Sequence, residues 1–294
     1  GEPQPGIIVA DQAVEAEVYQ ALVIGVRDYL GKNGFPGAII GLSGGIDSAL
    51  TLCIAVDALG ADKVRAVMMP SPYTAEISLS DSREMIRLLG VRYDEIPIEP
   101  AMQTFASMLE KEFSGLPADT TEENLQARIR GMILMALSNK TGSLVLTTGN
   151  KSEMAVGYCT LYGDMAGGFA VIKDIAKTLV YRLSRWRNSV SCAIPERIIT
   201  RAPSAELKPG QTDQDNLPPY DVLDAIIEAY MEDDLSPREI IARGYAEADV
   251  CRVVQLLKIS EYKRRQAPVG IRVTQRGFGK DWRYPITNRY RDPY

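Results

Sequence analysis

The sequence predicts an α/β protein with a doubly wound parallel sheet, followed by a C-terminal helical appendage. Short apolar runs, which are typical of buried parallel strands, alternate with segments whose apolar residues recur at helical spacing. Such alternation implies right-handed crossover connections between neighbouring parallel strands. Between residues 221 and 266, three helical segments follow one another with no strand between them, which predicts the appendage.

Four apolar runs are the expected strands. The first follows Pro36 and Gly37, and the second stops at Pro70 and Pro72, so glycine and proline bound both of them. The fourth has a fully apolar centre, as a strand that is covered on both faces requires. The strands are expected at residues 38–40, 64–69, 91–98 and 143–147.

The helices are indicated by apolar stripes and by capping residues. Val14, Leu22 and Leu30 belong to one stripe at helical spacing, and Thr120 or Thr121 is expected to cap a long helix. The expected helices span residues 14–30, 48–59, 80–89, 102–113, 122–139, 151–156, 174–189, 221–232, 236–243 and 246–266.

Composition divides the chain into a main domain and less regular segments. Residues 1–14 are rich in proline and glycine at their start and are expected to be a tail or linker, whereas 15–268 form the main domain. Residues 269–294 mix arginine, glycine and aromatics and predict an irregular C-terminal tail. Residues 201–219 are almost free of apolar side chains, which predicts a mobile loop of a length that is usually functional.

The charge and the missing residue types exclude several function classes. A net charge of −5 and a pI near 5.1 argue against a nucleic-acid partner. The chain has no histidine, so Ser-His triads and histidine metal sites are excluded, and its four cysteines form no C-x-x-C pair. No apolar run reaches membrane-spanning length, so we expect a cytoplasmic protein without a membrane partner. Catalysis would have to use carboxylates, lysine, hydroxyls and a metal.

A glycine-rich turn connects the first strand to the next helix. A turn that ends at a helix N-terminus is an anion site, because its amides lack partners and the helix dipole favours negative charge. A plain connecting turn is the alternative for two glycines alone, but the six-residue pattern Ser-Gly-Gly-x-Asp-Ser resembles the pyrophosphate loop of the ATP pyrophosphatases. The phosphate-binding residues are therefore expected to be Gly41, Leu42, Ser43, Gly44, Gly45, Ile46, Asp47 and Ser48.

A second polar segment follows the fourth strand. Thr148 would lie at the end of that strand, and Glu153 would lie one helical turn further on. Open parallel sheets bind ligands at the carboxyl ends of their strands, so Asp47 and Glu153 can converge on one magnesium ion. The alternative for Glu153 is an exposed carboxylate that favours the start of its helix.

Four further segments make the resemblance specific. Residues 148–153 (TGNKSE), 158–168 (YCTLYGDMAGG), 124–130 (NLQARIR) and 261–264 (EYKR) resemble segments of the NAD synthetases, in that family's order. The resemblance runs from about residue 15 to the C-terminus and implies the adenine nucleotide alpha hydrolase-like fold. It is closest to the synthetase half of the glutamine-dependent enzymes, whose nitrilase-like amidase domain has no match here.

The resemblance implies a reaction and a set of site residues. The carboxylate of deamido-NAD would attack the α-phosphorus of ATP, pyrophosphate would leave, and ammonia would then displace AMP to give the amide of NAD. Asp47 and Glu153 would hold magnesium, with Asp47 and Lys177 as the catalytic residues. By resemblance, ATP would also contact Thr148, Lys177 and Ser204, and deamido-NAD would contact Asn124, Arg128, Glu153, Lys263 and Arg264.

Other readings remain open from the sequence. Without the resemblance, Lys177 would be taken as a solvated helix lysine, and Lys263 and Arg264 as a charged helix end. The chain also fits another ATP pyrophosphatase, such as a GMP synthetase or a tRNA sulfur transferase, or a nucleotide-binding module without turnover. The resemblance further implies a homodimer, with the stripe 14–30 or the helix 122–139 at its interface, and a glutaminase domain or subunit outside these residues.

Overall fold

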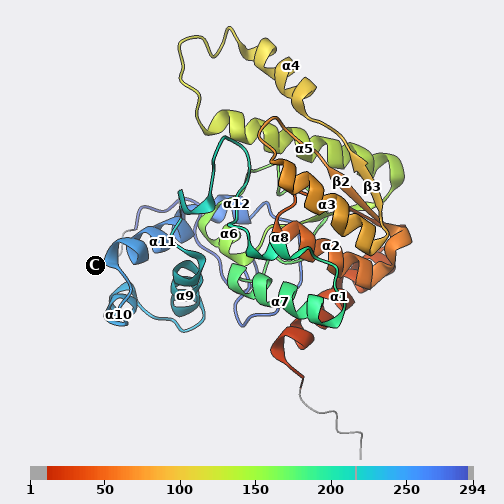
Figure 1. Cartoon of the computed structure of the whole chain (residues 1–294). Coiled ribbons are helices and arrows are strands. Elements are labelled where there is room, and N and C mark those ends of the chain that lie inside the picture. Colours follow the sequence, from red (N-terminus) through yellow and green to blue (C-terminus); the bar gives the residue numbers. More distant parts are fainter. Residues whose placement is uncertain (1–11, 216, 291–294) are drawn as a thin grey trace, which may run out of the picture.

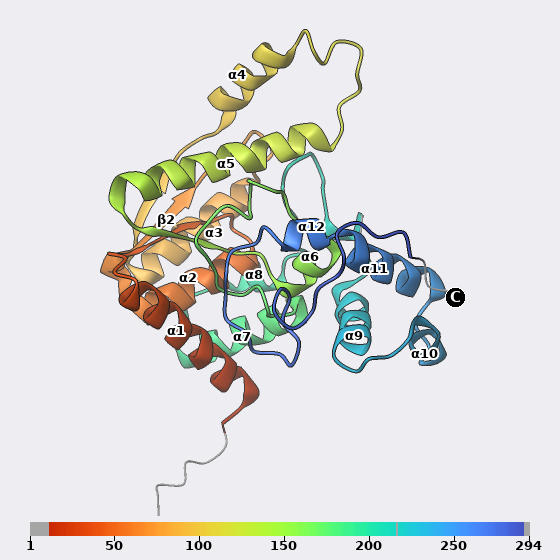
Figure 2. The ribbon, with the colours of Figure 1, turned by 180° about the vertical axis from the view of Figure 1, so that it is seen from behind.

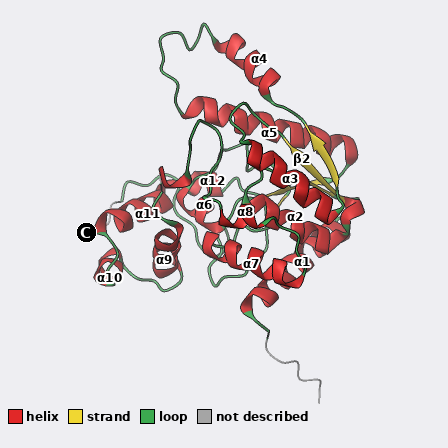
Figure 3. Ribbon diagram, viewed as in Figure 1, coloured by secondary structure: helices red, strands yellow, loops and turns green. Residues whose placement is uncertain are grey.

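The computed structural model describes residues 12–215 and 217–290, and a five-stranded parallel sheet lies at the centre of this part of the chain (Figures 1 and 3). The strand order is β3-β2-β1-β4-β5, and each strand runs parallel to its neighbours in this sheet. The predicted doubly wound α/β class is therefore confirmed. The strands are β1 (Ala38–Gly41), β2 (Val64–Met68), β3 (Arg92–Glu95), β4 (Leu144–Thr147) and β5 (Phe169–Ala170).

The two faces of the sheet are covered by different helices. In β1, Ala38 and Ile40 join one hydrophobic cluster and Ile39 joins another, because successive side chains of a strand point to opposite faces. The same alternation holds for Leu144, Val145 and Leu146 in β4. Helices α1 (Val14–Lys32), α2 (Ile46–Leu59), α3 (Glu76–Leu89) and α7 (Lys177–Val190) contribute to the first cluster, and α4 (Glu99–Leu109) and α5 (Thr120–Thr141) to the second.

A second body of helices lies beside the carboxyl edge of the sheet (Figure 2). Its apolar cluster joins Ala155 and Val156 to residues such as Leu223, Val253 and Leu257. The appendage therefore packs directly against the short helix that follows β4. Its helices are α9 (Tyr220–Met231), α10 (Pro237–Ala242), α11 (Glu247–Ile259) and α12 (Glu261–Arg264). Helices α9, α11 and α12 pack against α6 (Lys151–Val156), and α10 packs against α9 and α11.

Most differences from prediction concern where helices begin and end. Asp119 caps α5, in place of Thr120 or Thr121, because its carboxylate accepts the Thr121 N–H while the Glu122 side chain accepts the Asp119 N–H. The helix expected at 246–266 is divided at Ser260 into α11 and α12. The other shifted helices are α2, α3, α4 and α7, which begin at residues 46, 76, 99 and 177.

Several short elements were not predicted. The two-residue strand β5 pairs with Leu146 and Thr147 of β4, and its Ala170 also forms a bridge with Gly270. Helix α8 (Glu196–Thr200) is about one and a half turns long. The 3-10 helices are η1 (Ala61–Lys63) and, within the expected loop 201–219, η2 (Asp213–Asp215). Residues 1–11 of the expected tail and 291–294 lie outside the described residues. Among those described, no helix combines the length and the apolar character needed to cross a bilayer.

A buried ion network fastens the chain's C-terminal segment to the start of α6. The Lys151 ammonium lies 3.1 Å from Asp174 Oδ1 and 2.8 Å from Glu232 Oε1, and it donates to the Thr274 hydroxyl at 2.6 Å. Asp174 in turn accepts the backbone N–H groups of Val273 and Thr274. Four segments that are far apart in the sequence are thereby joined at one lysine.

We predict that Lys151→Met strongly destabilises the fold. The change leaves the buried Asp174 and the partly buried Glu232 without their cation, which costs about 3–5 kcal/mol of unfolding free energy. Urea unfolding followed by circular dichroism measures the loss. The matched control is Lys32→Met, because Lys32 pairs with Asp28 on an exposed helix face, where an ion pair contributes about 1 kcal/mol or less. Equal losses in the two variants would contradict the network's role.

Candidate active site

The turn between β1 and α2 presents backbone amides at a helix N-terminus. The helix is capped by Gly45, which offers no side-chain acceptor. The Ser48 hydroxyl donates to the Gly45 carbonyl at 2.9 Å and accepts the Ser43 N–H at 3.2 Å, and the Ser43 hydroxyl accepts the Gly45 N–H at 3.2 Å. The first amides of α2 have no acceptor within the helix, so this turn has the geometry of a phosphate-binding turn.

Only glycine fits at the second position of this turn. Gly44 has a φ of +79°, in the left-handed region, and an added Cβ would lie 2.8 Å from the Cβ and the carbonyl oxygen of Ser78. Backbone conformation and close contact with α3 therefore both exclude a side chain there. This fixes the path of the turn against α3.

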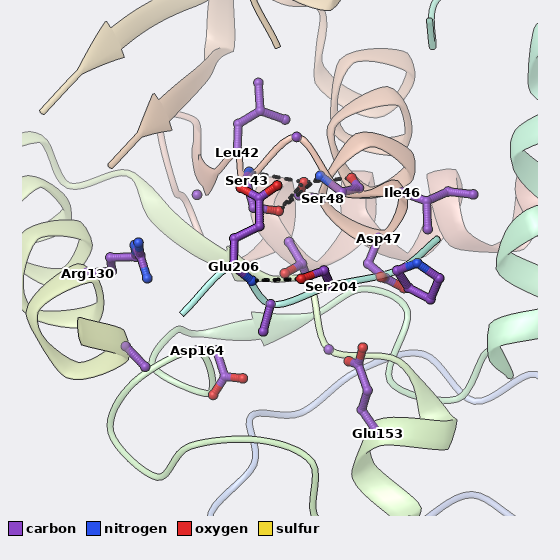
Figure 4. A pocket seen from close by; sticks show the side chains of 18 of the residues that line it. Leu42, Ser43, Ile46, Asp47, Ser48, Arg130, Glu153, Asp164, Ser204 and Glu206 are labelled. Atoms are coloured by element: carbon purple, nitrogen blue, oxygen red, sulfur yellow. Dashed lines mark hydrogen bonds between the residues drawn. The ribbon is translucent and has the colours of Figure 1, made fainter. Parts of the chain in front are cut away.

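The turn forms one wall of a pocket at the carboxyl ends of β1, β2 and β4 (Figure 4). The strand order reverses between β1 and β4, which is where doubly wound sheets bind ligands. Helix α5 contributes Arg130 and Leu134 to another wall, and residues 201–207 border the opening. Asp47 and Glu153 approach the same space from α2 and α6, as Figure 4 shows.

A buried lysine lies between those two carboxylates. Lys177 has only 2% of its surface exposed; its ammonium forms an ion pair with Asp47 Oδ2 and lies 3.7 Å from Glu153 Oε1. Burial alone would lower the pKa of Lys177, but the charges of Asp47 and Glu153 outweigh it and raise that pKa. Lys177 therefore carries a fixed positive charge in the pocket, and it is not the solvated helix lysine of the alternative reading.

Asn150 orients both carboxylates, that of Asp47 with its side chain and that of Glu153 with its backbone N–H. Its Nδ2 group donates to Asp47 Oδ1 at 2.9 Å, and its Oδ1 accepts the Glu153 N–H at 3.0 Å. Glu153 accepts the Asn150 N–H at 3.2 Å, which completes a capping box at the start of α6. Glu153 is thus the helix-start carboxylate expected from the sequence, but it points into the pocket instead of into solvent.

The paired carboxylates fit a divalent cation that is shared with a phosphate ligand. The described residues hold no cluster of three or more potential protein ligands, so a cage made only of side chains is absent there. Magnesium usually takes one or two carboxylates and completes its shell with water and substrate phosphates. Burial and the nearby negative charge of Asp47 raise the pKa of Glu153 above its usual value, because the two carboxylates repel each other, and a bound cation would relieve that repulsion.

The structure brings one group of the predicted residues together in this pocket and leaves another group outside it. All eight residues of the turn line the pocket with Thr148, Glu153, Lys177 and Ser204. Of the other predicted substrate contacts, Arg128 lines a neighbouring hollow that shares Gly131 and Ala166 with the pocket. Asn124 lies behind the pocket wall, where its Oδ1 accepts the Thr160 hydroxyl at 2.8 Å.

Two cationic side chains of α12 donate their hydrogen bonds to acceptors of the same chain. Arg264 does not reach the pocket: its side chain is 1% exposed and donates to Glu261 and to the carbonyls of Met154, Ala155 and Leu257. In this arrangement Arg264 does not face a ligand in the pocket, and leaving those acceptors would break the packing of α6 on α12. Its role as a dinucleotide contact stays a prediction. Lys263 donates to the carbonyls of Gly157 and Cys159, both at 2.7 Å, and so anchors the loop 158–168.

Several charged residues of the pocket escaped sequence reasoning. Arg201 donates to the Gly44 carbonyl at 3.2 Å and to the Ser78 hydroxyl at 2.9 Å, and Glu206 accepts the Ala75 N–H at 3.2 Å. Arg130 and Asp213 also line the pocket, and Asp213 accepts the Tyr220 hydroxyl at 2.8 Å. Arg130 lies within the segment 124–130, which resembles the NAD synthetases, and Arg201, Glu206 and Asp213 lie in the loop 201–219. No spacing in the sequence indicates that these individual side chains enter the pocket.

Comparison with known proteins agrees with this geometry. The family model described as NAD synthase matches residues 18–267. The chain belongs to the NAD synthase family. It is 58% identical over 278 residues to the glutamine-dependent NAD(+) synthetase of Acinetobacter baylyi, covering 94% of this chain and 51% of that protein. It is 54% identical over 281 residues to the Thermotoga maritima protein of the same description, covering 95% of this chain and 49% of that one.

Solved structures of NAD synthase relatives share the fold. A glutamine-dependent NAD+ synthetase from Acinetobacter baumannii, in complex with ADP, aligns with a TM-score of 0.65 and 52% identity over 97% of this chain and 51% of that chain. NMN synthetase from Francisella tularensis aligns with a TM-score of 0.74 and 28% identity over 86% of this chain and 97% of that one. The chain spans about half the length of the curated relatives it matches.

We predict that Gly44→Ala lowers stability. The left-handed conformation costs a residue with a Cβ roughly 1–2 kcal/mol, and the contact with Ser78 adds to that cost. Chemical denaturation measures the change. The control is Gly31→Ala in α1, where an added Cβ meets nothing within 4 Å and the helix should gain about 0.5–1 kcal/mol. If Gly44→Ala proved as stable as the wild type, residue 44 would not have the left-handed conformation and the close contact with Ser78 described here.

Proposed function

We propose that the chain amidates deamido-NAD to NAD, using ATP and ammonia and releasing AMP and pyrophosphate. The observation that carries the proposal is the meeting of the glycine turn with Lys177, Asp47 and Glu153 in one pocket. Membership of the NAD synthase family supports it, as do the relatives described as glutamine-dependent NAD(+) synthetases. A carboxylate substrate is already a nucleophile, which suits a chain without histidine.

The proposed first step is the attack of the nicotinate carboxylate on the α-phosphorus of ATP. The β- and γ-phosphates would lie on the amides of the turn and leave as pyrophosphate, with Ser43 and Ser48 beside them. Lys177 would offset the charge that develops on the leaving group, and its burial makes this interaction stronger than it would be in water. Ammonia would then attack the acyl carbon, and AMP would leave.

We further propose that Asp47 and Glu153 hold a magnesium ion together with the phosphates. Both carboxylates line the pocket next to the turn, and Asn150 fixes their orientation. The ion would polarise the phosphate oxygens and neutralise part of their charge. Lys177, which now pairs with both carboxylates, would then be free to contact the phosphates.

The dinucleotide is proposed to extend from the pocket toward Arg128 and the loop 158–168. The neighbouring hollow is lined by apolar residues such as Met132 and Met165, with Tyr162 and Gln266 at its edge. Asn124 and Lys263 would act through the loop, since each of them contacts it. The two ends of deamido-NAD would then occupy two neighbouring spaces.

A homodimer is also proposed, with α5 as the interface. Met132 and Met135 of α5 are exposed at 64% and 37%, and both border the hollow just described. The other candidate, the stripe of α1, is unsuitable because Leu22, Val26 and Leu30 are buried in the first hydrophobic cluster of the same chain. A glutaminase domain or subunit would supply ammonia in a longer assembly, as the length and description of the relatives suggest.

The loop 201–219 is proposed to close over ATP. Arg201, Ser204 and Glu206 lie between the turn and α5, and Gln126 donates to the Leu207 carbonyl at 2.9 Å. Glu206 has a φ of +50°, a conformation that non-glycine residues rarely adopt, and such strain is concentrated at functional sites. The loop is thus held against both walls of the pocket.

We predict that Asp47→Ala abolishes pyrophosphate release. Incubation with ATP, deamido-NAD, Mg²⁺ and ammonium should give NAD and AMP with the wild type, and the rate should fall at least about a hundredfold in the variant, since the metal and Lys177 both lose a partner. The control Asp62→Ala changes an exposed aspartate outside the pocket and should keep the wild-type rate.

Three outcomes distinguish the readings. Pyrophosphate with xanthosine monophosphate instead of deamido-NAD would identify a GMP synthetase-like enzyme. ATP binding without pyrophosphate from any acceptor would favour a module without turnover. If this chain alone used glutamine as a nitrogen source at the same rate as ammonium, it would contain a glutaminase site that the proposal lacks.

A further inference from the structure

The N-terminus of α7 is capped by side chains from two other helices. Its N-cap residue is Ala176, which has no side-chain acceptor, so the first amides of α7 need partners from outside the helix. The Lys177 N–H donates to the Ser152 hydroxyl oxygen of α6 at 2.9 Å. The Thr178 N–H donates to Asp224 Oδ2 of α9 at 2.8 Å. Both contacts lie in the first turn, where a carboxylate also suits the helix dipole.

The same aspartate also orients the serine. The Ser152 hydroxyl donates to Asp224 Oδ1, so one carboxylate of the appendage holds α6 and α7 together. Ser152 is 1% exposed and Asp224 is 8% exposed, so water does not readily replace either contact. Helix α9 lies beside α6 and α7 in both views of the ribbon (Figures 1 and 2).

This connection bears directly on the charged cluster of the pocket. Lys177 is the first residue of α7, and Glu153 follows Ser152 in α6. Bonds that end at Asp224 therefore help to fix the main chain at both residues. Asp224 itself does not line the pocket, so it can act only through the residues it holds.

We propose that Asp224 is a positioning residue for the amidation reaction, holding Lys177 and Glu153 in register with Asp47. This inference rests on the proposed function for its catalytic consequence. Its structural content, the capping of α7 by Ser152 and Asp224, stands independently of which substrate is used. Asp224 thereby takes part in the reaction without contacting a reactant in the pocket.

The test is the substitution Asp224→Asn, which keeps the size of the side chain. An amide carries no charge and has an NH2 group in place of one carboxylate oxygen, so it cannot accept the Ser152 hydroxyl and the Thr178 N–H at the two positions that Asp224 offers. The hold on the first turn of α7 should weaken, and α7 should shift relative to α6. We expect single-turnover pyrophosphate formation to slow about ten- to a hundredfold, as small misplacements of catalytic groups do. The KM for ATP should change little, because the amides of the glycine turn are untouched.

A second readout does not depend on any substrate. Amide hydrogen exchange at Lys177 and Thr178, followed by NMR or by mass spectrometry of overlapping peptides, should accelerate in Asp224→Asn relative to the rest of α7. Ser152→Ala should produce the same local acceleration. The double variant Ser152→Ala/Asp224→Asn should form pyrophosphate no more slowly than the slower of the two single variants. Both substitutions interrupt the same connected set of hydrogen bonds, so their effects should not add. Ser152→Thr, which retains the hydroxyl, should recover most of the rate lost in Ser152→Ala.

The matched control is Asp221→Asn, which changes an exposed carboxylate in the first turn of the same helix. It should leave the rate and the exchange unchanged. The inference is overturned if folded Asp224→Asn has the wild-type rate and wild-type exchange, or if its rate falls only in proportion to the unfolded fraction. If Asp224→Asn does not fold, the Ser152 variants decide by the same criteria. A wild type that makes no NAD would refute the proposed function, whereas the exchange data would still decide the capping.

Discussion

The ion pair of Lys177 with Asp47, with Glu153 3.7 Å away, is the interaction on which the rest of the site depends. Each of the three side chains comes from a different helix, and each of those helices begins at the carboxyl edge of the sheet. A buried cation is tolerated only with paired acceptors, so α2, α6 and α7 cannot move apart without exposing an unpaired charge to the interior. The cluster thus has a structural role and also prepares a charged pocket.

The packing around this cluster explains why it can be held so closely. Alternate residues of β1 enter two hydrophobic clusters, so the strand that delivers the glycine turn is fixed on both faces. Lys151 fastens the start of α6 to the C-terminal segment, and Asp224 holds α6 to α7. The irregular residues 268–290 are therefore bound to the framework that positions Glu153. The turn that would bind phosphate and the segments that position Glu153 and Lys177 are therefore different parts of the chain.

The sequence predicted those parts of the molecule in which the signal is local. The apolar strand, the glycine turn and the start of α6 were located because each follows from neighbouring residues, such as Asn150 and Glu153 in one capping box. The acceptors of Arg264 in α6 are 109 and 110 residues away in the sequence, and Leu257 of α11 is 7 residues away. The burial of Arg264 depends on how these helices pack together, so it could not be predicted from the sequence. Asp213 and Glu206 were missed for the same reason: their partners come from other segments, and the loop that carries them has no periodic pattern.

The central claim is that the turn after β1 holds the leaving pyrophosphate while Asp47 and Glu153 share a cation with it. A crystal structure of the chain with Mg²⁺ and an ATP analogue that cannot be cleaved between its α- and β-phosphates tests this most directly. The account predicts the β- and γ-phosphates against the amides of Gly44 to Ser48, and a magnesium ion about 2.1 Å from an oxygen of each carboxylate. Phosphates bound elsewhere in the pocket, with Lys177 still paired with Asp47, would contradict the account.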